Sequence, residues 1–575
     1  MVKKSLSLFG GIVLTAFLFV GVSAQPAQTG SRTQPSGKTE TPVVKKSAPV
    51  TIEKIEQDVA EVLTVIEENH VNGKNLNYND LFKSSIDSML HTLDPHSNYF
   101  DAKEFEQFRT DQSSQYFGIG ATIGDLRDNK NNIIATYIKA TFENAPANRA
   151  GLRYGDKIVD VNGTSMLGKS FSEVRNFLRG PRGTTAKITV ERYGTNKRET
   201  FDIVRDAVSQ PSIAEAYMIR PGVGYVAMTG GFNQTTFAEF RQAMQSLKAQ
   251  GMNQLVLDLR NNGGGLVNQA YQVANTFLNR GQIIFTQRGR VEGAENPYPA
   301  QNPSPDKTPI VVLVNRNSAS ASEILADDQS AVVVLQRAGE NTFGKGLVQN
   351  PFVLEYGSML LLTIAKYETP SGRLIQRDYS DGNLYDYYTD GGSLREEVQR
   401  ERPKGAESKT DLGRTVYSGG GINPDRVIKS PTIPVERARF QARLNDPIFA
   451  FTLDLAYGSL KGFETFKVDR PIAFAYDLKS SDFQITENLY QLFKKYATEK
   501  YNFTAAQIER EREFVERSLR TELVTAAYGS TTSFRVFNEY DTQLKQAIDL
   551  LPEARQLALD GAKVNERKRN VGANR

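Results

Sequence analysis

Three serines at the start of a predicted helix have a setting that favours chemistry. Pro309–Asn315 reads as a buried strand, and Ser318, Ser320 and Ser322 follow it among alanines. Small neighbours leave a hydroxyl accessible, and the free N–H groups of a helix N-terminus can stabilise an oxyanion. The same pattern is typical of a serine that caps a helix. The residues alone do not decide between these two interpretations, nor which of the three serines would act.

A lysine between two glycines is the second candidate. Lys345 stands between Gly344 and Gly346, a position that does not suit a purely structural lysine. Desolvation lowers the pKa of a lysine, and the neutral amine can then take the proton of a serine. The rival interpretation is a P-loop, because Gly339, Gly344 and Lys345 match its spacing. Gly346 occupies the position of the magnesium-binding Ser or Thr, so the sequence disfavours a nucleotide site.

The small number of histidines and the lack of cysteine limit which catalytic mechanisms the chain could use. The chain has no cysteine and three histidines, His70, His91 and His96, all within a predicted N-terminal helical unit. A zinc site or a cysteine nucleophile is therefore not expected in the rest of the chain. A Ser-His-Asp triad would need a histidine from another unit. The expected base is a lysine or a carboxylate, with no metal and no cofactor.

A run of glycines supplies a third element. Gly263–Gly265 follows a predicted strand, 254–259, and precedes a predicted helix. Backbone N–H groups in such a run can approach a ligand closely. Asp258 and Arg260 beside the run are interpreted as structural rather than catalytic.

These candidates must be positioned by several folded units, because 575 residues exceed one hydrophobic core. Apolar residues recur first at helical spacing, then in short strands between glycines, then in alternating strands and helices, and finally in helices again. Two polar stretches, 287–307 and 378–415, are predicted surface loops. The predicted α+β multidomain chain comprises a signal peptide (1–24), a flexible linker (25–49), an N-terminal helical unit (50–114), a β-rich domain with two helices (115–206), an α/β core (207–430) and a helical C-terminal extension (431–575).

The N-terminus predicts export. Lys3 and Lys4 precede a short apolar run, Leu6–Val20, and Val22–Ala24 fits a small-residue cleavage site before Gln25. The alternative is an uncleaved membrane anchor. A periplasmic location is expected, with a secreted or membrane-anchored protein as the alternatives.

With these elements in order, the chain resembles the C-terminal processing (tail-specific) serine peptidases, over most of residues 50–430. In that family the β-rich domain is a PDZ domain, and the α/β core is the serine-peptidase core. The motifs that carry the resemblance are Leu93–Ser97, Tyr116–Gly120, Ala150–Leu152 with Gly155 and Asp156, Asp258–Gly265, Ser318–Ile324, Thr342–Gln349, Thr369–Arg373 and Gly420–Asp425.

The resemblance implies roles for individual residues. It makes Ser320 the nucleophile, Lys345 the general base, and Gln349, one helical turn later, the residue that orients the lysine. The oxyanion hole would combine the backbone N–H of Ala321 with one from a glycine, Gly264 or Gly265. The groove that binds a substrate tail would be formed by Tyr116, Phe117, Gly118, Ile119 and Gly120.

The implied function is that of an exported serine endopeptidase, which cleaves proteins near or from their C-termini after its PDZ domain binds the tail. Its partners would be protein or peptide substrates with free C-termini. A homo-oligomer and an adaptor protein are compatible with the sequence, whereas the near-balanced charge (+4) gives no reason to expect nucleic acid. Asp327 and Asp328, with Gln336 and Arg337, depart from the family pattern between the serine and the lysine. The alternative function is therefore a catalytically impaired PDZ scaffold that binds protein C-termini.

Overall fold

The computed structural model describes residues 51–291, 293, 295–327, 336–389, 405–410, 415–468, 471–560 and 563. The predicted signal peptide and linker, and residues 328–335, lie outside this part of the chain. The chain divides into two compact units, Met1–Leu93 and Asp94–Arg575. Across the described residues, no helix combines the length and the apolar character that a bilayer span requires.

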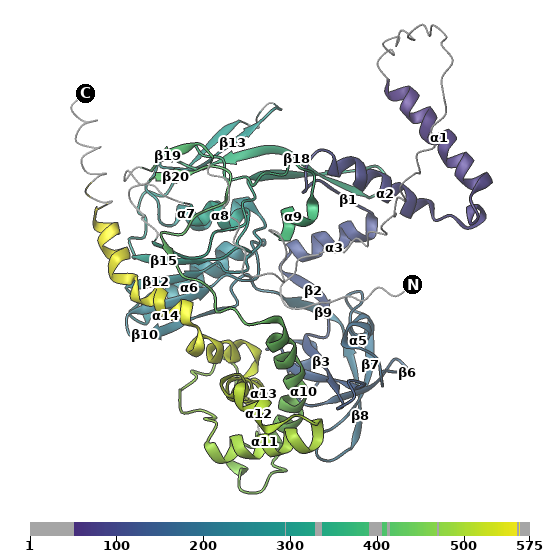
Figure 1. Ribbon diagram of the computed structural model, residues 1–575, viewed down its shortest axis with the longest axis vertical. Coiled ribbons are helices and arrows are strands. Elements are labelled where there is room, and N and C mark those ends of the chain that lie inside the picture. The colour runs from purple at the N-terminus through teal and green to yellow at the C-terminus, as the bar shows by residue number, and fades with distance from the viewer. Residues whose placement is uncertain are drawn as a thin grey trace, which may run out of the picture. The chain divides into compact units, whose positions relative to one another are not determined.

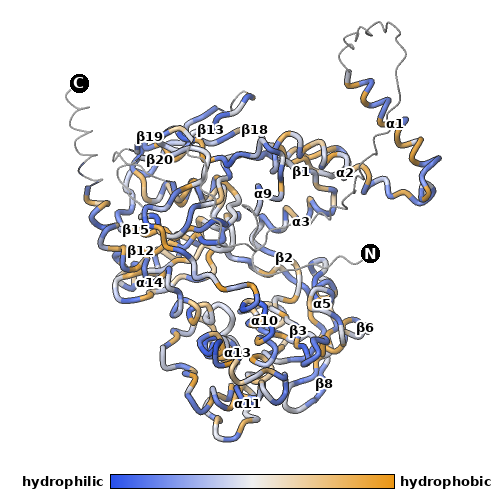
Figure 2. Tube along the Cα trace, viewed as in Figure 1, coloured by the Kyte–Doolittle hydropathy of each residue, from blue (hydrophilic) through white to orange (hydrophobic). Residues whose placement is uncertain are grey.

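The described part of the first unit, from residue 51 on, is helical, and its residues belong to no buried hydrophobic cluster. It contains helix α1 (Ile52–Asn69), the 3-10 turn η1 (Gly73–Asn75) and helix α2 (Tyr78–His91). None of the residues of α1 is buried, and its tube alternates between hydrophobic and hydrophilic colours in Figure 2. The apolar residues of α1 that remain exposed are Ile52, Ile55, Val59, Val62 and Val65.

The second unit is built around a six-stranded sheet in the order β10-β11-β12-β15-β16-β21. The first pair is antiparallel and the remaining pairs are parallel. Its strands are β10 (Glu215–Arg220), β11 (Val223–Ala227), β12 (Gln254–Asp258), β15 (Ile310–Val314), β16 (Gln336–Gly339) and β21 (Arg426–Val427).

Helices cover both faces of this sheet, which explains why its central strands are continuous apolar runs. All five residues of β15 are buried; Val312 faces a cluster with Phe240 and Ile324, whereas Leu313 faces Leu544. Figure 1 shows α14 crossing this second face beside β12 and β15. The covering helices are α6 (Thr236–Ala249), α7 (Val267–Asn275) and α8 (Ala321–Ala326) on one face and α14 (Thr542–Asp549) on the other.

The prediction of two surface loops is wrong in part, because one stretch contributes strands to a second, antiparallel sheet and the other contains a helix. Residues 287–307 contain the end of one strand and all of another, and Phe285 stacks on Tyr298 at 4.4 Å between ring centroids. The polar and proline residues there concealed a hairpin. Residues 378–415 contain a helix, α9, whose Tyr387 is buried. The elements are β1 (Asn98–Phe100), β13 (Ile283–Gly289), β14 (Asn296–Pro299), β17 (Leu347–Val353), β18 (Met359–Glu368) and α9 (Leu384–Thr389), with a separate pair β19 (Glu407–Lys409) and β20 (Thr415–Tyr417).

The β-rich domain has its own core and its own sheet, β3-β4-β5-β7-β8, with β6 paired to β5. Strands β2 and β9 pair with each other where the domain begins and ends. After helix α3 (Ala102–Gln112), its elements are β2 (Gln115–Gly118), β3 (Ala121–Arg127), β4 (Ile133–Thr141), α4 (Pro146–Arg149), β5 (Lys157–Val161), β6 (Thr164–Ser165), α5 (Phe171–Leu178), β7 (Thr185–Glu191), β8 (Arg198–Val204) and β9 (Asp206–Ser209).

The C-terminal helices pack against the β-rich domain. Phe449 of α10 packs edge-on against Tyr137 and Tyr154, and Lys139 lies 3.0 Å above the ring of Phe449. The same lysine pairs with Glu522 of α13 at 3.0 Å. These helices are α10 (Val435–Ala456), η2 (Glu464–Phe466), α11 (Glu487–Tyr501), α12 (Ala505–Arg510) and α13 (Arg512–Tyr540), which is broken at Gly529.

The same extension is also bound to the core. Arg260, directly after β12, pairs with Asp258 and with Asp541, each at 2.6 Å, and donates to Gln543. Asp258 and Arg260 are thus engaged in structural contacts. The C-terminal extension therefore contacts both the β-rich domain and the core, and the predicted α+β multidomain fold is confirmed.

Candidate active site

Ser320 lies at a sharp turn between β15 and α8. Its backbone has φ 57° and ψ −117°, a conformation that residues other than glycine rarely adopt. Such a conformation costs about 1–3 kcal/mol and persists only where the surroundings impose it. The turn places the serine at the N-terminus of α8, with its side chain 8% exposed.

The structure itself distinguishes Ser320 from its neighbours. Ser318 Oγ donates to Leu259 O at 2.8 Å, and Ser322 Oγ donates to Asn262 O at 2.9 Å. Both of these side chains are fully buried. Among the described residues, Ser320 Oγ donates no hydrogen bond, and the Ser320 side chain faces the backbone N–H of Glu323 in a capping box. Ser318 and Ser322 thus hold the turn together, and of the three serines only Ser320 does not donate its hydroxyl proton.

Glu323 joins the backbone of this serine to the segment that carries the lysine. Its carboxylate accepts from the backbone N–H groups of Ser320, Gly344 and Lys345, each at 2.8 Å, and from Thr342 Oγ1 at 2.5 Å. Burial raises the pKa of Glu323, and the four donors oppose that rise. The sequence analysis missed this residue, although a carboxylate three positions after a candidate nucleophile in an apolar helix is a usable signal.

Lys345 is half-buried beside Ser320. Tyr367 Oη lies 2.8 Å from Lys345 O and 3.2 Å from Ser320 O, so one hydroxyl contacts both backbones. Burial lowers the pKa of Lys345 to about 8, while the carboxylates of Asp94 and Glu323 oppose this. Within the described chain, no hydrogen bond joins Lys345 Nζ to Ser320 Oγ. In unliganded active sites such bonds are often long and tighten only with substrate.

His96 corrects the prediction that every histidine lies outside the core. It belongs to the second unit, and its Nε2 lies 2.7 Å from Tyr387 Oη. Burial lowers the pKa of His96 well below its usual value, and the positive charges of Lys345 and Arg377 lower it further. His96 is therefore neutral and within electrostatic reach of Lys345. Its ring nitrogens contact Tyr387 and Tyr388, so it forms no Ser-His pair with Ser320.

Gln349 lies on a strand, so the prediction of one helical turn between it and Lys345 is wrong. Its side chain belongs to β17 and donates to Thr363 Oγ1 of β18 at 3.2 Å. No hydrogen bond between Gln349 and Lys345 occurs in the part of the chain that the structure describes. A role for Gln349 in orienting the lysine stays a prediction.

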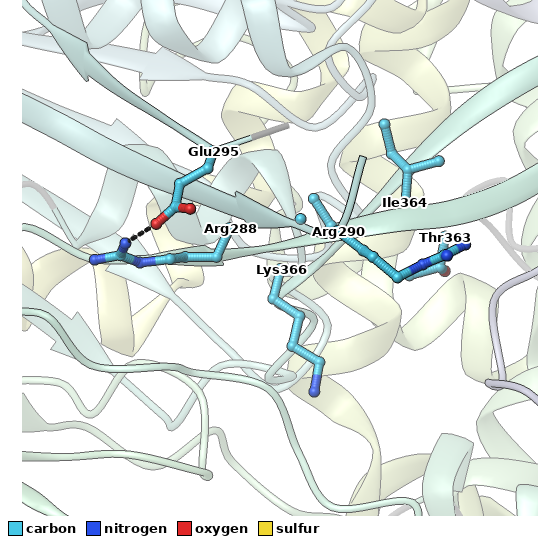
Figure 3. Close-up of a pocket in the computed structure, with 8 residues that line it drawn as sticks. Arg288, Arg290, Glu295, Thr363, Ile364 and Lys366 are labelled. Carbon is cyan, nitrogen blue, oxygen red and sulfur yellow. Dashed lines mark hydrogen bonds and ion pairs between the residues drawn. The ribbon is translucent and has the colours of Figure 1, made fainter. Parts of the chain in front are cut away.

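A cavity of about 450 Å³ opens beside Thr363, at the edge of β18. Figure 3 shows Arg290 extending toward Thr363, while Arg288 pairs with Glu295 on the opposite side. Neither Ser320 nor Lys345 lines this cavity. It is a basic recess next to the partner of Gln349, separate from the serine turn.

The predicted oxyanion donors lie around Ser320. A Cβ atom on Gly264 would meet Ser320 Cβ at 2.8 Å, so only glycine permits this approach. The Gly264 N–H donates to Asn262 Oδ1 at 2.9 Å. Among the described residues, the N–H groups of Gly265 and Ala321 have no partner. Of the two glycines, Gly265 is therefore the one whose N–H group is not already bonded in the described chain.

Between Ser320 and Lys345 the sequence departs from the family pattern, and the described residues of this segment are nevertheless well paired. Asp327 ends α8, is buried, and pairs with Arg373 and with Arg337. Gln336–Gly339 forms β16, parallel to β15. The two buried arginines thus neutralise Asp327. Asp328 lies outside the described residues.

The predicted tail groove contains a cavity of about 160 Å³ between β3 and α5. Tyr116, Ile119 and Gly120 line it, whereas Phe117 and Gly118 do not. The Arg179 guanidinium lies 4.8 Å above the ring of Tyr116. The complete lining is Tyr116, Ile119, Gly120, Ala121, Ile123, Phe171, Arg175, Leu178 and Arg179.

Within the described residues, no group of three or more histidine, aspartate or glutamate side chains is arranged to hold a metal ion. What the site presents is a serine hydroxyl that donates no hydrogen bond, a lysine of lowered pKa and two unpartnered N–H groups. This combination can perform nucleophilic acyl transfer.

Comparisons with known proteins agree with this chemistry. The family model of peptidase family S41 matches residues 222–385, and that of the PDZ domain matches residues 138–192. The carboxy-terminal-processing protease of Bartonella bacilliformis is 34% identical over 305 residues, which cover 52% of this chain and 67% of the relative. The carboxy-terminal processing protease CtpB of Bacillus subtilis is 32% identical over 300 residues, covering 52% and 61%.

Among solved structures, the photosystem II D1 C-terminal processing protease is 26% identical. The match covers 66% of this chain and 94% of that one, with a TM-score of 0.33. The two curated relatives are thus matched over about two thirds of their own length.

Proposed function

Because this chain belongs to peptidase family S41, with the PDZ-containing C-terminal processing serine proteases, we propose that Ser320 and Lys345 carry its catalysis and that its PDZ domain delivers substrate tails. The observation that carries this proposal is the Glu323 carboxylate, which binds the backbone N–H groups of both Ser320 and Lys345. A buried carboxylate with these partners fixes the separation of nucleophile and base.

The proposed reaction uses the neutral amine of Lys345. The amine takes the proton of Ser320 Oγ as the oxygen attacks the scissile carbonyl, and the N–H groups of Ala321 and Gly265 receive the oxyanion. The resulting ammonium gives its proton to the leaving amine, and water then releases the acyl group by the same steps. With a pKa of about 8, about a tenth of the amine is neutral at neutral pH.

The proposed tail site is the cavity between β3 and α5. A tail that extends along β3 would add a strand to the PDZ sheet, and its C-terminal carboxylate would take N–H bonds from the Phe117–Gly120 segment, where β2 ends and the loop to β3 begins. The cavity of about 160 Å³ with Ile119, Ile123 and Leu178 in its wall suits one apolar side chain. We therefore propose substrates with free, apolar C-termini.

A cleavage assay tests the proposal against the alternative of a PDZ scaffold without catalysis. An unstructured peptide with an apolar free C-terminus is incubated with the full chain or with the Ser320→Ala variant, and fragments are identified by mass spectrometry. We expect fragments only with the unchanged chain. Binding of the peptide by both proteins without fragments from either would favour the scaffold.

We also propose export to the periplasm, supported by the basic, apolar and small-residue pattern of residues 1–24. Sequencing the N-terminus of the protein purified from its own cells tests this. A mature chain that begins at Gln25 is expected, and an unprocessed Met1 in the cytoplasm would contradict it.

A further inference from the structure

The positions of the two ends of α5 define the direction in which a bound tail would run through the cavity. At the start of the helix, the Phe171 N–H donates to Asp125 Oδ1 at 2.6 Å, so this end lies beside the later part of β3. At the other end, the Arg179 guanidinium covers Tyr116, just before the Phe117–Gly120 segment. The helix therefore ends at the segment proposed to bind the terminal carboxylate.

Two arginines, Arg175 of α5 and Arg179 directly after the helix, line the cavity without an ion-pair partner among the described residues. Arg175 and Arg179 are both exposed, four residues apart, and neither forms an ion pair in the described chain. No acidic residue lines the cavity. Partial desolvation lowers the pKa of Arg179 and the charge of Arg175 lowers it further, while Tyr116 and the carboxylate of Asp111 oppose this. The two cations therefore repel each other.

Most of the other arginines of the PDZ domain differ from this pair. Pairing with a carboxylate is the usual state there, and it leaves little charge to attract a ligand. The paired arginines of the domain are Arg127, Arg149, Arg182, Arg192 and Arg198. In the described chain Arg153 and Arg205 form no ion pair either, and the Arg205 guanidinium donates to the backbone oxygens of Leu178 and Phe177. Arg175 and Arg179 are thus the unpaired arginines that line the cavity.

We propose that Arg175 and Arg179 make this PDZ domain select acidic tails, with a carboxylate side chain at the third residue from the C-terminus. This inference rests on the tail binding proposed above. Four helical residues advance by about 6 Å, and two residues of a strand advance by about 6.6 Å. If Arg179 faces the terminal carboxylate, Arg175 faces the residue two positions earlier. The substrate class is thus a tail with an acidic third-from-last residue and an apolar end.

The test uses the full chain with Ser320→Ala, so that peptides bind without being cleaved. Three fluorescein-labelled peptides share one sequence and a free apolar C-terminus, and carry Glu, Gln or Lys at the third position from the end. Fluorescence anisotropy gives the Kd of each. Exposed ion pairs of this kind predict that the Glu peptide binds about two- to fivefold tighter than the Gln peptide, with the Lys peptide weakest. Higher salt should shrink this difference.

Matched variants locate the effect. Arg175→Gln should remove the preference for Glu over Gln, while Arg198→Gln, at an exposed arginine outside the cavity, should keep it. Arg179→Gln should weaken all three free-acid peptides by a similar factor. Equal affinities for the Glu and Gln peptides, or a preference that survives Arg175→Gln, would overturn the inference.

An amidated version of the Glu peptide distinguishes two negative results. One is the absence of selection for an acidic side chain, and the other is the absence of tail recognition itself. If free acids bind more tightly than the amide but Glu and Gln bind equally, the domain reads the terminus and the acidic selection is wrong. If acid and amide bind equally, tail recognition itself is wrong, and the inference falls with it.

Discussion

The serine site and the PDZ cavity differ in whether their polar groups are paired within the protein. Around Ser320, neighbouring polar groups are engaged inside the protein, by Glu323, Tyr367 and the flanking serines, and of the three serine hydroxyls only that of Ser320 donates no hydrogen bond. In the PDZ cavity, no carboxylate of the described residues pairs with Arg175 or Arg179, and the Arg179 guanidinium lies over the ring of Tyr116. The catalytic geometry is therefore fixed by buried hydrogen bonds, whereas recognition depends on exposed charge that a single substitution can change.

The largest expected effect comes from the two groups proposed to react. Ser320→Ala or Lys345→Ala should each lower kcat by about 10⁴-fold or more, and the double variant should be no worse, because groups that act as one unit are not additive. Peptide affinity, measured by anisotropy, should remain unchanged. Chelators and thiol reagents should have no effect, and strong inhibition by EDTA would contradict the assignment.

Glu323→Gln should have the next largest effect. An amide presents one acceptor oxygen in place of two, and its NH₂ group faces N–H donors that it cannot bind. We expect kcat to fall about a hundredfold, since small displacements of reacting groups are that costly, with little change in KM. Glu355→Gln, at an exposed position, is the control. An unchanged kcat in Glu323→Gln would show that this carboxylate does not position the pair.

The pH dependence distinguishes the lysine from the buried histidine. Because neutral Lys345 is the proposed base, kcat/KM should rise about tenfold per pH unit below its pKa and level off above about 8. Asp94→Asn should move this limb to lower pH, because the Asp94 carboxylate raises the pKa of Lys345. A limb near the usual pKa of histidine that disappears in His96→Gln would assign the limb to His96 instead.

The smallest effect is expected at the PDZ cavity. Amidating the C-terminus of a substrate peptide should raise KM by about three- to tenfold and leave kcat unchanged, because a charge-assisted hydrogen bond far from the serine is lost. Steady-state kinetics on the matched acid and amide peptides measure this. A fall in kcat would mean that the cavity also controls the serine site, and the contrast between the two regions would not hold.

The sequence predicted the strands and helices of the core well, because buried parallel strands such as Ile310–Val314 are unbroken apolar runs. The choice of Ser320 among three serines needed the family resemblance, since the partners of Ser318 and Ser322 come from the loop after β12. Those contacts join residues about 60 positions apart, and no local pattern reports them.

Other residues of the site were missed for the same reason. Tyr367 reaches the serine turn from β18, and His96 reaches Tyr387 across 291 positions. The four-residue spacing of Lys345 and Gln349 fits a helix or an irregular strand start equally well, and pairing with β18 decides for the strand. Periodicity describes one element at a time, whereas these placements depend on two.

The ion pair between Arg260 and Asp541 has a consequence for the order in which the protein is made. The glycine loop proposed to receive the oxyanion begins directly after Arg260, and its anchors, Asp541 and Gln543, are translated 281 and 283 residues later. While the chain is still growing on the ribosome, this loop lacks its support. Proteolytic competence would then arrive only after Asp541 and Gln543 have been made, when the PDZ domain and the strands of the core have already been translated.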